Sequence, residues 1–107
     1  MYARMLEGTL KLEKKPEFTK KMREEIIPIL RKQMGFADII GLEHDAKPDK
    51  FCLLTLWHNK TDAERYERET FPKLNEIIKP YLVMPVVVNI FKVDTTISEH
   101  VIAAVAA

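Results

Sequence analysis

The chain has 107 residues, enough for one domain with its own hydrophobic core and too few for two. Lys and Arg number 17 against 16 Asp and Glu, so this near-zero net charge gives no electrostatic reason to expect nucleic acid or an anionic membrane as a partner. No apolar run approaches the roughly 20 residues of a membrane span, and the start MYARMLEG lacks the regions of a signal peptide, which predicts a cytoplasmic protein.

The N-terminal third predicts a strand followed by a helix. Residues 2–12 alternate unevenly between apolar and polar side chains, which is typical of a strand. Apolar residues then recur at three- and four-residue spacing over 18–30, which indicates a helix, and Gly35 is expected to end it as the C′ residue. Pro28 lies inside this helix and removes one hydrogen bond, so a kink or a break near Glu25 is predicted.

The middle of the chain predicts a hairpin. Phe36 to Glu43 is interpreted as the second strand, and the polar residues 45–49 form a turn after it. Phe51 to Trp57 is an apolar run broken only by Thr55, which favours a strand covered on both faces at the centre of a sheet. The two strands are therefore expected to pair antiparallel.

A second helix is predicted to begin at Thr61. Residues 61–64 form a capping box, in which the Thr61 hydroxyl accepts from the Glu64 amide and the Glu64 carboxylate accepts from the Thr61 amide. The helical pattern runs to Thr70, and Pro72 then opens a second apolar segment. This helix is therefore expected to be bent or double.

The last predicted strand covers residues 83–93, which are strongly β-forming. Pro85 cannot donate a hydrogen bond to a neighbouring strand, so an edge position is favoured. Alternate residues are apolar on both faces of this strand, and the central strand repeats that pattern. Residues 1–94 are expected to form the domain, and residues 95–107, which end in VIAAVAA, are expected to pack on a partner subunit.

The order strand, helix, strand, strand, helix, strand predicts an α+β, ferredoxin-like βαββαβ sheet with both helices on one face. The opposite face then needs a cover. If this face stayed in contact with water, the protein would lose roughly 1.5–3 kcal/mol of stabilisation for each large apolar side chain that could be fully buried. We therefore expect a homodimer with its sheets face to face, which forms a dimeric α/β barrel.

Trp57 at the exit of the central strand, the helix signal TDAERYERETFPKL and the βαββαβ order resemble the antibiotic-biosynthesis monooxygenase (ABM) family of dimeric α+β barrels. The resemblance implies a cofactor-independent monooxygenase acting on a small phenolic or quinol-like molecule, with Trp57 as a wall against the substrate. Haem-degrading relatives pair this Trp with a helix His and a first-strand Asn, which the chain lacks. No cofactor is therefore expected.

Each candidate residue has a functional and a structural interpretation. Trp57 either contacts substrate or only packs in the core. His58 or Tyr66 is expected to transfer a proton, although His58 also fits an exposed strand end. Asn89, the one polar interruption in its strand, is either a hydrogen-bonded buried amide or a contact to substrate. The expected catalytic residues are Trp57, His58, Tyr66 and Asn89, and the expected substrate-binding residues are Thr55, Leu53, Phe91 and Tyr81.

No metal site is predicted. His44 and His58 lie at opposite ends of the hairpin, roughly 25 Å apart at about 3.3 Å per residue. The alternative to an enzyme is a non-catalytic dimeric barrel that binds a small apolar ligand or is purely structural. A cavity near Trp57 with two converging polar groups favours the monooxygenase, whereas a filled interior favours the alternative.

Overall fold

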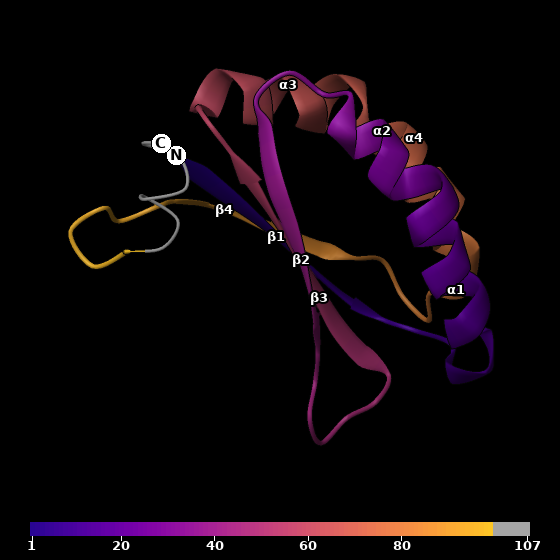
Figure 1. The fold of residues 1–107 in the computed structure, drawn as a ribbon. Coiled ribbons are helices and arrows are strands. Elements are labelled where there is room, and N and C mark those ends of the chain that lie inside the picture. Colours follow the sequence, from indigo (N-terminus) through magenta and orange to yellow (C-terminus); the bar gives the residue numbers. More distant parts are fainter. Residues whose placement is uncertain (100–107) are drawn as a thin grey trace.

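The computed structural model describes residues 1–99 and has an α+β fold, in which helices cover one face of an antiparallel sheet (Figure 1). In this part of the chain the sheet has four strands in the order β2-β3-β1-β4, which is the predicted ferredoxin-like arrangement. The strands are β1 (Tyr2–Thr9), β2 (Phe36–Glu43), β3 (Lys50–Trp57) and β4 (Val87–Lys92). Residues 100–107 of the expected tail lie outside the described residues.

The sheet confirms the predicted hairpin and the predicted edge strand. β3 pairs antiparallel with β2 on one side and with β1 on the other, so it lies inside the sheet. β4 pairs only with β1 among the described strands, and Pro85 precedes it. β4 begins later than predicted, because the chain first makes a separate bridge between Leu82 and Leu10, the Val83 amide donates to the Thr9 carbonyl, and residues 83–86 form no strand.

The first helical segment is irregular, as Pro28 predicted. It consists of a 3-10 turn η1 (Leu12–Lys14), α1 (Lys15–Lys21), a π-helical turn η2 (Met22–Ile26) and α2 (Ile27–Arg31). The π-helical turn lies where the break was expected. The expected helix end at Gly35 is wrong, because the Lys32 amide donates to the Ile29 carbonyl at 3.2 Å and tightens the last turn earlier. Gly35 instead leads into β2 with φ of 80°.

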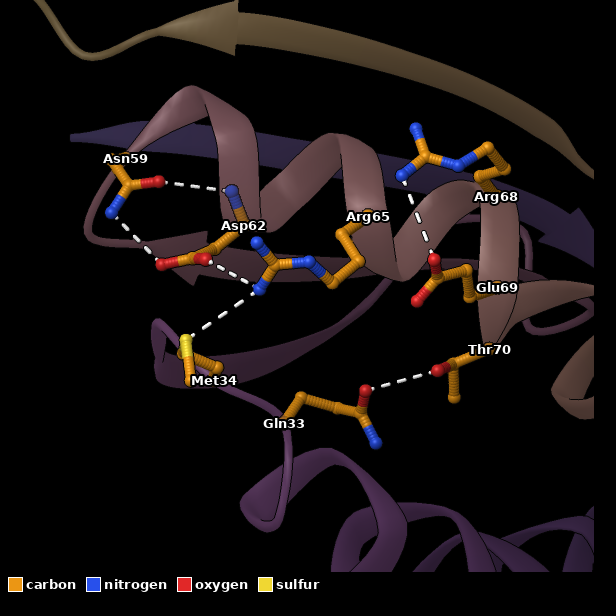
Figure 2. Close-up of polar contacts among 8 residues, drawn as sticks. All are labelled: Gln33, Met34, Asn59, Asp62, Arg65, Arg68, Glu69 and Thr70. Atoms are coloured by element: carbon orange, nitrogen blue, oxygen red, sulfur yellow. Dashed lines mark hydrogen bonds and ion pairs between the residues drawn. The ribbon is translucent and has the colours of Figure 1, made fainter.

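The second helical segment is double, as predicted. It comprises α3 (Lys60–Glu69), α4 (Phe71–Ile78) and the 3-10 turn η3 (Lys79–Tyr81). The predicted start at Thr61 is wrong, because the N-cap is Asn59. Its side chain accepts from the Asp62 amide at 2.9 Å and donates to the Asp62 carboxylate at 2.8 Å (Figure 2). Asn is among the strongest N-cap residues, and with its extended backbone it places the cap two residues before Thr61, so the helix begins at Lys60.

We expect Asn59→Ala to lower the free energy of unfolding by about 1 kcal/mol, because it removes the N-cap of α3. Thr61→Ala is the matched control, since Thr61 is an exposed residue inside the helix. Urea denaturation followed by circular dichroism measures both. A larger loss for Thr61→Ala than for Asn59→Ala would contradict the assigned cap.

The two faces of the sheet differ. The helix-covered face carries alternate residues of β1 and β3, among them Leu6, Leu53 and Trp57, which belong to the hydrophobic core or pack against it. The opposite face, here called the open face, carries apolar side chains that are 40–55% exposed, namely Ile40, Leu42, Val87 and Phe91. Figure 1 shows no helix over this face in the described residues. No helix within residues 1–99 is both long and apolar enough for a membrane crossing.

Candidate functional site

A small cavity of about 20 Å³ lies between the helices and the covered face of the sheet. Three polar residues are among those that line it, namely Arg4 of β1, Thr55 of β3 and Tyr66 of α3. The rest of its wall is apolar and includes Leu53 and Met22. A volume of this size holds about one water molecule, and three polar residues converge on it. The cavity therefore combines a nearly filled interior with converging polar groups.

Arg4 is the unusual residue of this cavity. It is 2% exposed, although Arg is almost never fully buried unless it is paired. Its Nε atom donates to the carboxylate of Glu67 on α3, and the guanidinium carbon lies 3.9 Å from the ring centre of Phe71. Nη2 is buried and has no hydrogen-bond partner within the described residues. An unpaired buried donor costs about 1–3 kcal/mol, so a group that accepts from Nη2 would bind favourably.

Tyr66 is the second polar residue of the cavity. Burial raises its pKa to about 12, although the positive charge of Arg4 opposes that rise. Tyr66 therefore stays protonated at neutral pH, where its hydroxyl can donate a hydrogen bond but is not a phenolate base. Of the expected role of Tyr66 in proton transfer, only hydrogen-bond donation remains, because a protonated hydroxyl does not accept the substrate proton.

Trp57 lies behind the cavity rather than in its wall, which corrects the expected stacking wall. Its indole is fully buried and stacks on Tyr66 with ring centres 4.7 Å apart. Its Nε1 donates to the hydroxyl of Thr55 at 3.0 Å. Tyr66 and Thr55 contact the indole and also line the cavity, so Trp57 holds both of these residues in place.

The other predicted site residues lie elsewhere. His58 is exposed beyond the end of β3. Asn89 pairs with Met5 and is exposed, and Phe91 pairs with Ala3, so both lie on the open face. The expected buried position of Asn89 is wrong because alternate residues of an edge strand reach the uncovered side. We therefore do not assign catalysis to His58 or Asn89, or substrate contact to Phe91.

Tyr81 lies at the opposite end of the core from Trp57. Its ring packs edge to face on Phe18 with centres 6.0 Å apart, and Phe18 in turn contacts Phe51. Phe51 precedes Trp57 by six residues on one strand, which is roughly 20 Å at about 3.3 Å per residue. Arg4 pairs with Thr55, roughly 13 Å along the strand from Phe51 at about 3.3 Å per residue, and Tyr81 does not line the cavity, so we do not assign substrate contact to Tyr81.

A larger groove of about 490 Å³ runs beside the β2–β3 hairpin and includes Leu42 and Cys52. Its polar residues come from the ends of strands and from the exposed turn, where His44 Nδ1 accepts from two backbone amides of that turn. It lacks a buried, unpartnered polar group, so we do not place the site there. No cluster of three His, Cys, Asp or Glu side chains within residues 1–99 could hold a metal ion.

Sequence reasoning missed Arg4, Glu67 and Phe71. One signal for Arg4 was present, because it shares the period of two with Leu6 on the face that carries the core. A charged residue on that face is a candidate for function. Glu67 had no such signal, because it stands among the alternating charges of α3 and only the fold brings it to Arg4.

No protein-family model matches the sequence, and no curated protein sequence matches it significantly. Solved structures do match. A candidate antibiotic biosynthesis monooxygenase from Deinococcus radiodurans is 13% identical with a TM-score of 0.77, over 92% of this chain and 98% of that one. A variant of SnoaB, a cofactor-independent oxygenase from Streptomyces nogalater, is 13% identical with a TM-score of 0.72, over 92% and 97%.

A further match is an antibiotic biosynthesis monooxygenase that is 15% identical with a TM-score of 0.71, over 88% of this chain and 99% of that one. At these identities the likeness concerns the fold. The chain therefore has the fold of antibiotic biosynthesis monooxygenase proteins over nearly its whole length, as its sequence pattern indicated.

Proposed function

We propose that the protein is a cofactor-independent monooxygenase of a small phenolic or quinol-like molecule. In this reaction the substrate supplies all the electrons and loses two hydrogens, the first of them as a proton, and both end in the water that is released. Dioxygen places one oxygen atom on a ring carbon, and its second oxygen leaves as water. The protein would hold the substrate oxygen with hydrogen-bond donors and keep bulk water away from the reacting anion.

The observation that carries this proposal is the buried Arg4 guanidinium with its unpartnered Nη2 at an apolar cavity. A fixed positive group in a site shielded from water stabilises a developing oxyanion far more than it would in solution. The Tyr66 hydroxyl is a second donor, because its raised pKa keeps it protonated. The shared fold with SnoaB adds support from a protein described as a cofactor-independent oxygenase.

A phenol is larger than the cavity, so binding requires side chains of the wall to move. Met22 and Ile26 line the cavity and delimit the π-helical turn η2. Methionine is flexible and unbranched, and π-helical turns often lie at functional sites. We propose that these side chains of the cavity wall move aside when substrate enters.

The test of this function compares dioxygen consumption with product formation. Metal-free protein is assayed on a panel of hydroquinones and anthrone-like phenols. Native protein is expected to exceed the buffer blank, and Tyr66→Phe is expected to lower turnover about tenfold or more, because it removes a donor to the anion. Tyr81→Phe is the matched control, since Tyr81 lies at the far end of the core. If native protein matches the blank across the panel, the proposed function is wrong.

A second candidate function is favoured by the small cavity volume. A non-catalytic dimeric barrel, closed or holding a small apolar ligand, would also have an interior with room for about one water. Ligand binding without oxygen-dependent product would support this alternative over the monooxygenase.

We also propose that the protein forms a homodimer through the open face. Light scattering coupled to size exclusion is expected to give twice the monomer mass. Phe91→Asp is expected to weaken the dimer by about 2 kcal/mol, roughly 30-fold in Kd, because it places a charge among the exposed apolar side chains of that face. Leu12→Asp is the control, since Leu12 is 49% exposed in η1, outside the sheet. A monomeric native protein would exclude the face-to-face dimer.

A further inference from the structure

The Arg4–Glu67 ion pair leaves one donor, Nη2 of Arg4, and one acceptor, the Glu67 carboxylate, available to a ligand. Arg4 Nε donates to Glu67, while Nη2 of the same guanidinium is buried without a partner in the described residues. Both donors belong to one planar group, so an oxygen atom that accepts the Nη2 hydrogen on the Nε side lies close to the Glu67 carboxylate. Each carboxylate oxygen can accept more than one hydrogen bond. A ligand group at this position can therefore accept from Arg4 and donate to Glu67.

Charge balance restricts which group fits. Arg4 is 2% exposed and is neutralised by Glu67, so the pair as a whole carries no net charge. A carboxylate ligand would add an unpaired negative charge beside Glu67 and would have no proton to donate. A hydroxyl group has one donor and two acceptor positions and adds no charge. It satisfies Nη2 and Glu67 together.

We propose that the Arg4–Glu67 pair recognises a neutral phenolic or enolic hydroxyl and discriminates against carboxylates. This inference rests on the proposed function, because it assigns the substrate to the same cavity. Nη2 of Arg4 donates to the hydroxyl oxygen, and the hydroxyl donates to Glu67. Phe71 packs on the guanidinium and keeps it in place.

The same contacts provide the route for the substrate proton. When the substrate anion forms, the hydroxyl O–H bond breaks and the proton passes to a Glu67 oxygen, which gives a neutral carboxylic acid. The negative charge stays on the substrate oxygen, where Nη2 of Arg4 donates to it. Glu67 thereby takes the role of proton acceptor that the raised pKa of Tyr66 denies to that residue at neutral pH.

Three ligands of similar size test the inference without dioxygen chemistry: phenol, its methyl ether anisole, and benzoate. Trp57 is the only tryptophan and stacks on Tyr66, so its fluorescence reports binding, with calorimetry as a second measurement. Native protein is expected to bind phenol about tenfold or more tightly than anisole, because anisole cannot donate to a charged acceptor. It is also expected to bind benzoate more weakly than phenol.

Glu67→Gln is expected to reverse this order. The variant keeps an oxygen that accepts from Arg4 but leaves the site with a positive charge, so benzoate should bind about tenfold more tightly than to native protein. The ratio between phenol and anisole should fall toward one. Glu67→Asp keeps the charge and should keep the weak binding of benzoate. Glu64→Gln on the exposed side of α3 is the control and should leave all three affinities unchanged.

The inference is overturned if native protein binds benzoate as tightly as phenol, or if it binds none of the three ligands. It is also overturned if the Glu67→Gln variant keeps the native order of affinities. Circular dichroism confirms that each variant is folded. Dioxygen consumption is measured separately. If the expected affinities hold while no compound consumes dioxygen, the hydroxyl site stands and the monooxygenase function fails.

Discussion

We expect the Arg4→Met variant to lose oxygen-dependent turnover by about 100- to 1,000-fold, the usual effect of removing a donor to a developing oxyanion. The guanidinium is the only cationic group that lines the cavity in the described part of the chain. The variant keeps a long, flexible side chain that can pack against Phe71 and Tyr66, as the guanidinium does now. The loss should therefore come from chemistry rather than from the fold.

The free energy of unfolding distinguishes a loss of chemistry from a loss of the fold. Arg4→Met removes the ion pair with Glu67, whose loss is offset because the buried charge is removed with it, and a contact to Phe71 worth about 0.5–2 kcal/mol. It also removes the unpartnered Nη2, which costs about 1–3 kcal/mol. Glu67 is 35% exposed and can turn toward water, so it is not left as a buried charge. The free energy of unfolding should change by less than about 1 kcal/mol in urea denaturation.

The matched control for Arg4 is Arg65→Met. Arg65 is 41% exposed on α3, pairs with Asp62 (Figure 2) and does not line the cavity. Native turnover is expected for this variant. If Arg4→Met retains turnover, or loses it only in proportion to its folded fraction, then Arg4 has no part in the reaction.

Trp57→Ala should lower the free energy of unfolding by about 3–5 kcal/mol, which is the range for truncating a fully buried aromatic side chain. The indole is 0% exposed, stacks on Tyr66 and packs edge to face on Phe36 with ring centres 5.6 Å apart. Its removal also takes away the hydrogen bond to Thr55. Circular dichroism in urea is the appropriate measurement, because the variant has no tryptophan fluorescence.

Two companion variants define the cause of that loss. Trp57→Phe keeps an aromatic ring and should lose clearly less stability than Trp57→Ala. His58→Ala changes the next residue, which is exposed, and should stay within about 0.5 kcal/mol of native protein. A loss below about 1 kcal/mol for Trp57→Ala would mean that the indole does not organise this end of the core.

Strand periodicity and proline chemistry predicted the order of the elements. The apolar run that ends at Trp57 identified the inner strand β3, and Pro85 identified the edge strand β4. Pro28 predicted the irregular helix that contains η2. The errors lay at element ends, as at Thr61 and Gly35, where Asn59 and a tight last turn decided the boundaries instead. These signals depend only on residues that are neighbours in the chain, so they can be identified in the sequence alone.

The candidate site was predicted only in part. Trp57, Tyr66, Thr55 and Leu53 do come together, because Trp57, Thr55 and Leu53 share one face of β3 and α3 packs over that end of the strand. Asn89 was misplaced because an apolar pattern on both faces of a strand does not reveal which face the helices cover. That choice depends on how the helices pack on the whole sheet.

The sequence alone determined the strand–helix order, the antiparallel hairpin and the excess of apolar side chains that leaves one sheet face exposed. Each of these follows from the period of two, the period of 3.6 or the chemistry of proline. Only the tertiary structure decided that Arg4 is buried and that its partner is Glu67, which lies 63 residues further along the chain. A contact over that separation depends on the packing of α3 against β1, and no local pattern in the sequence encodes it.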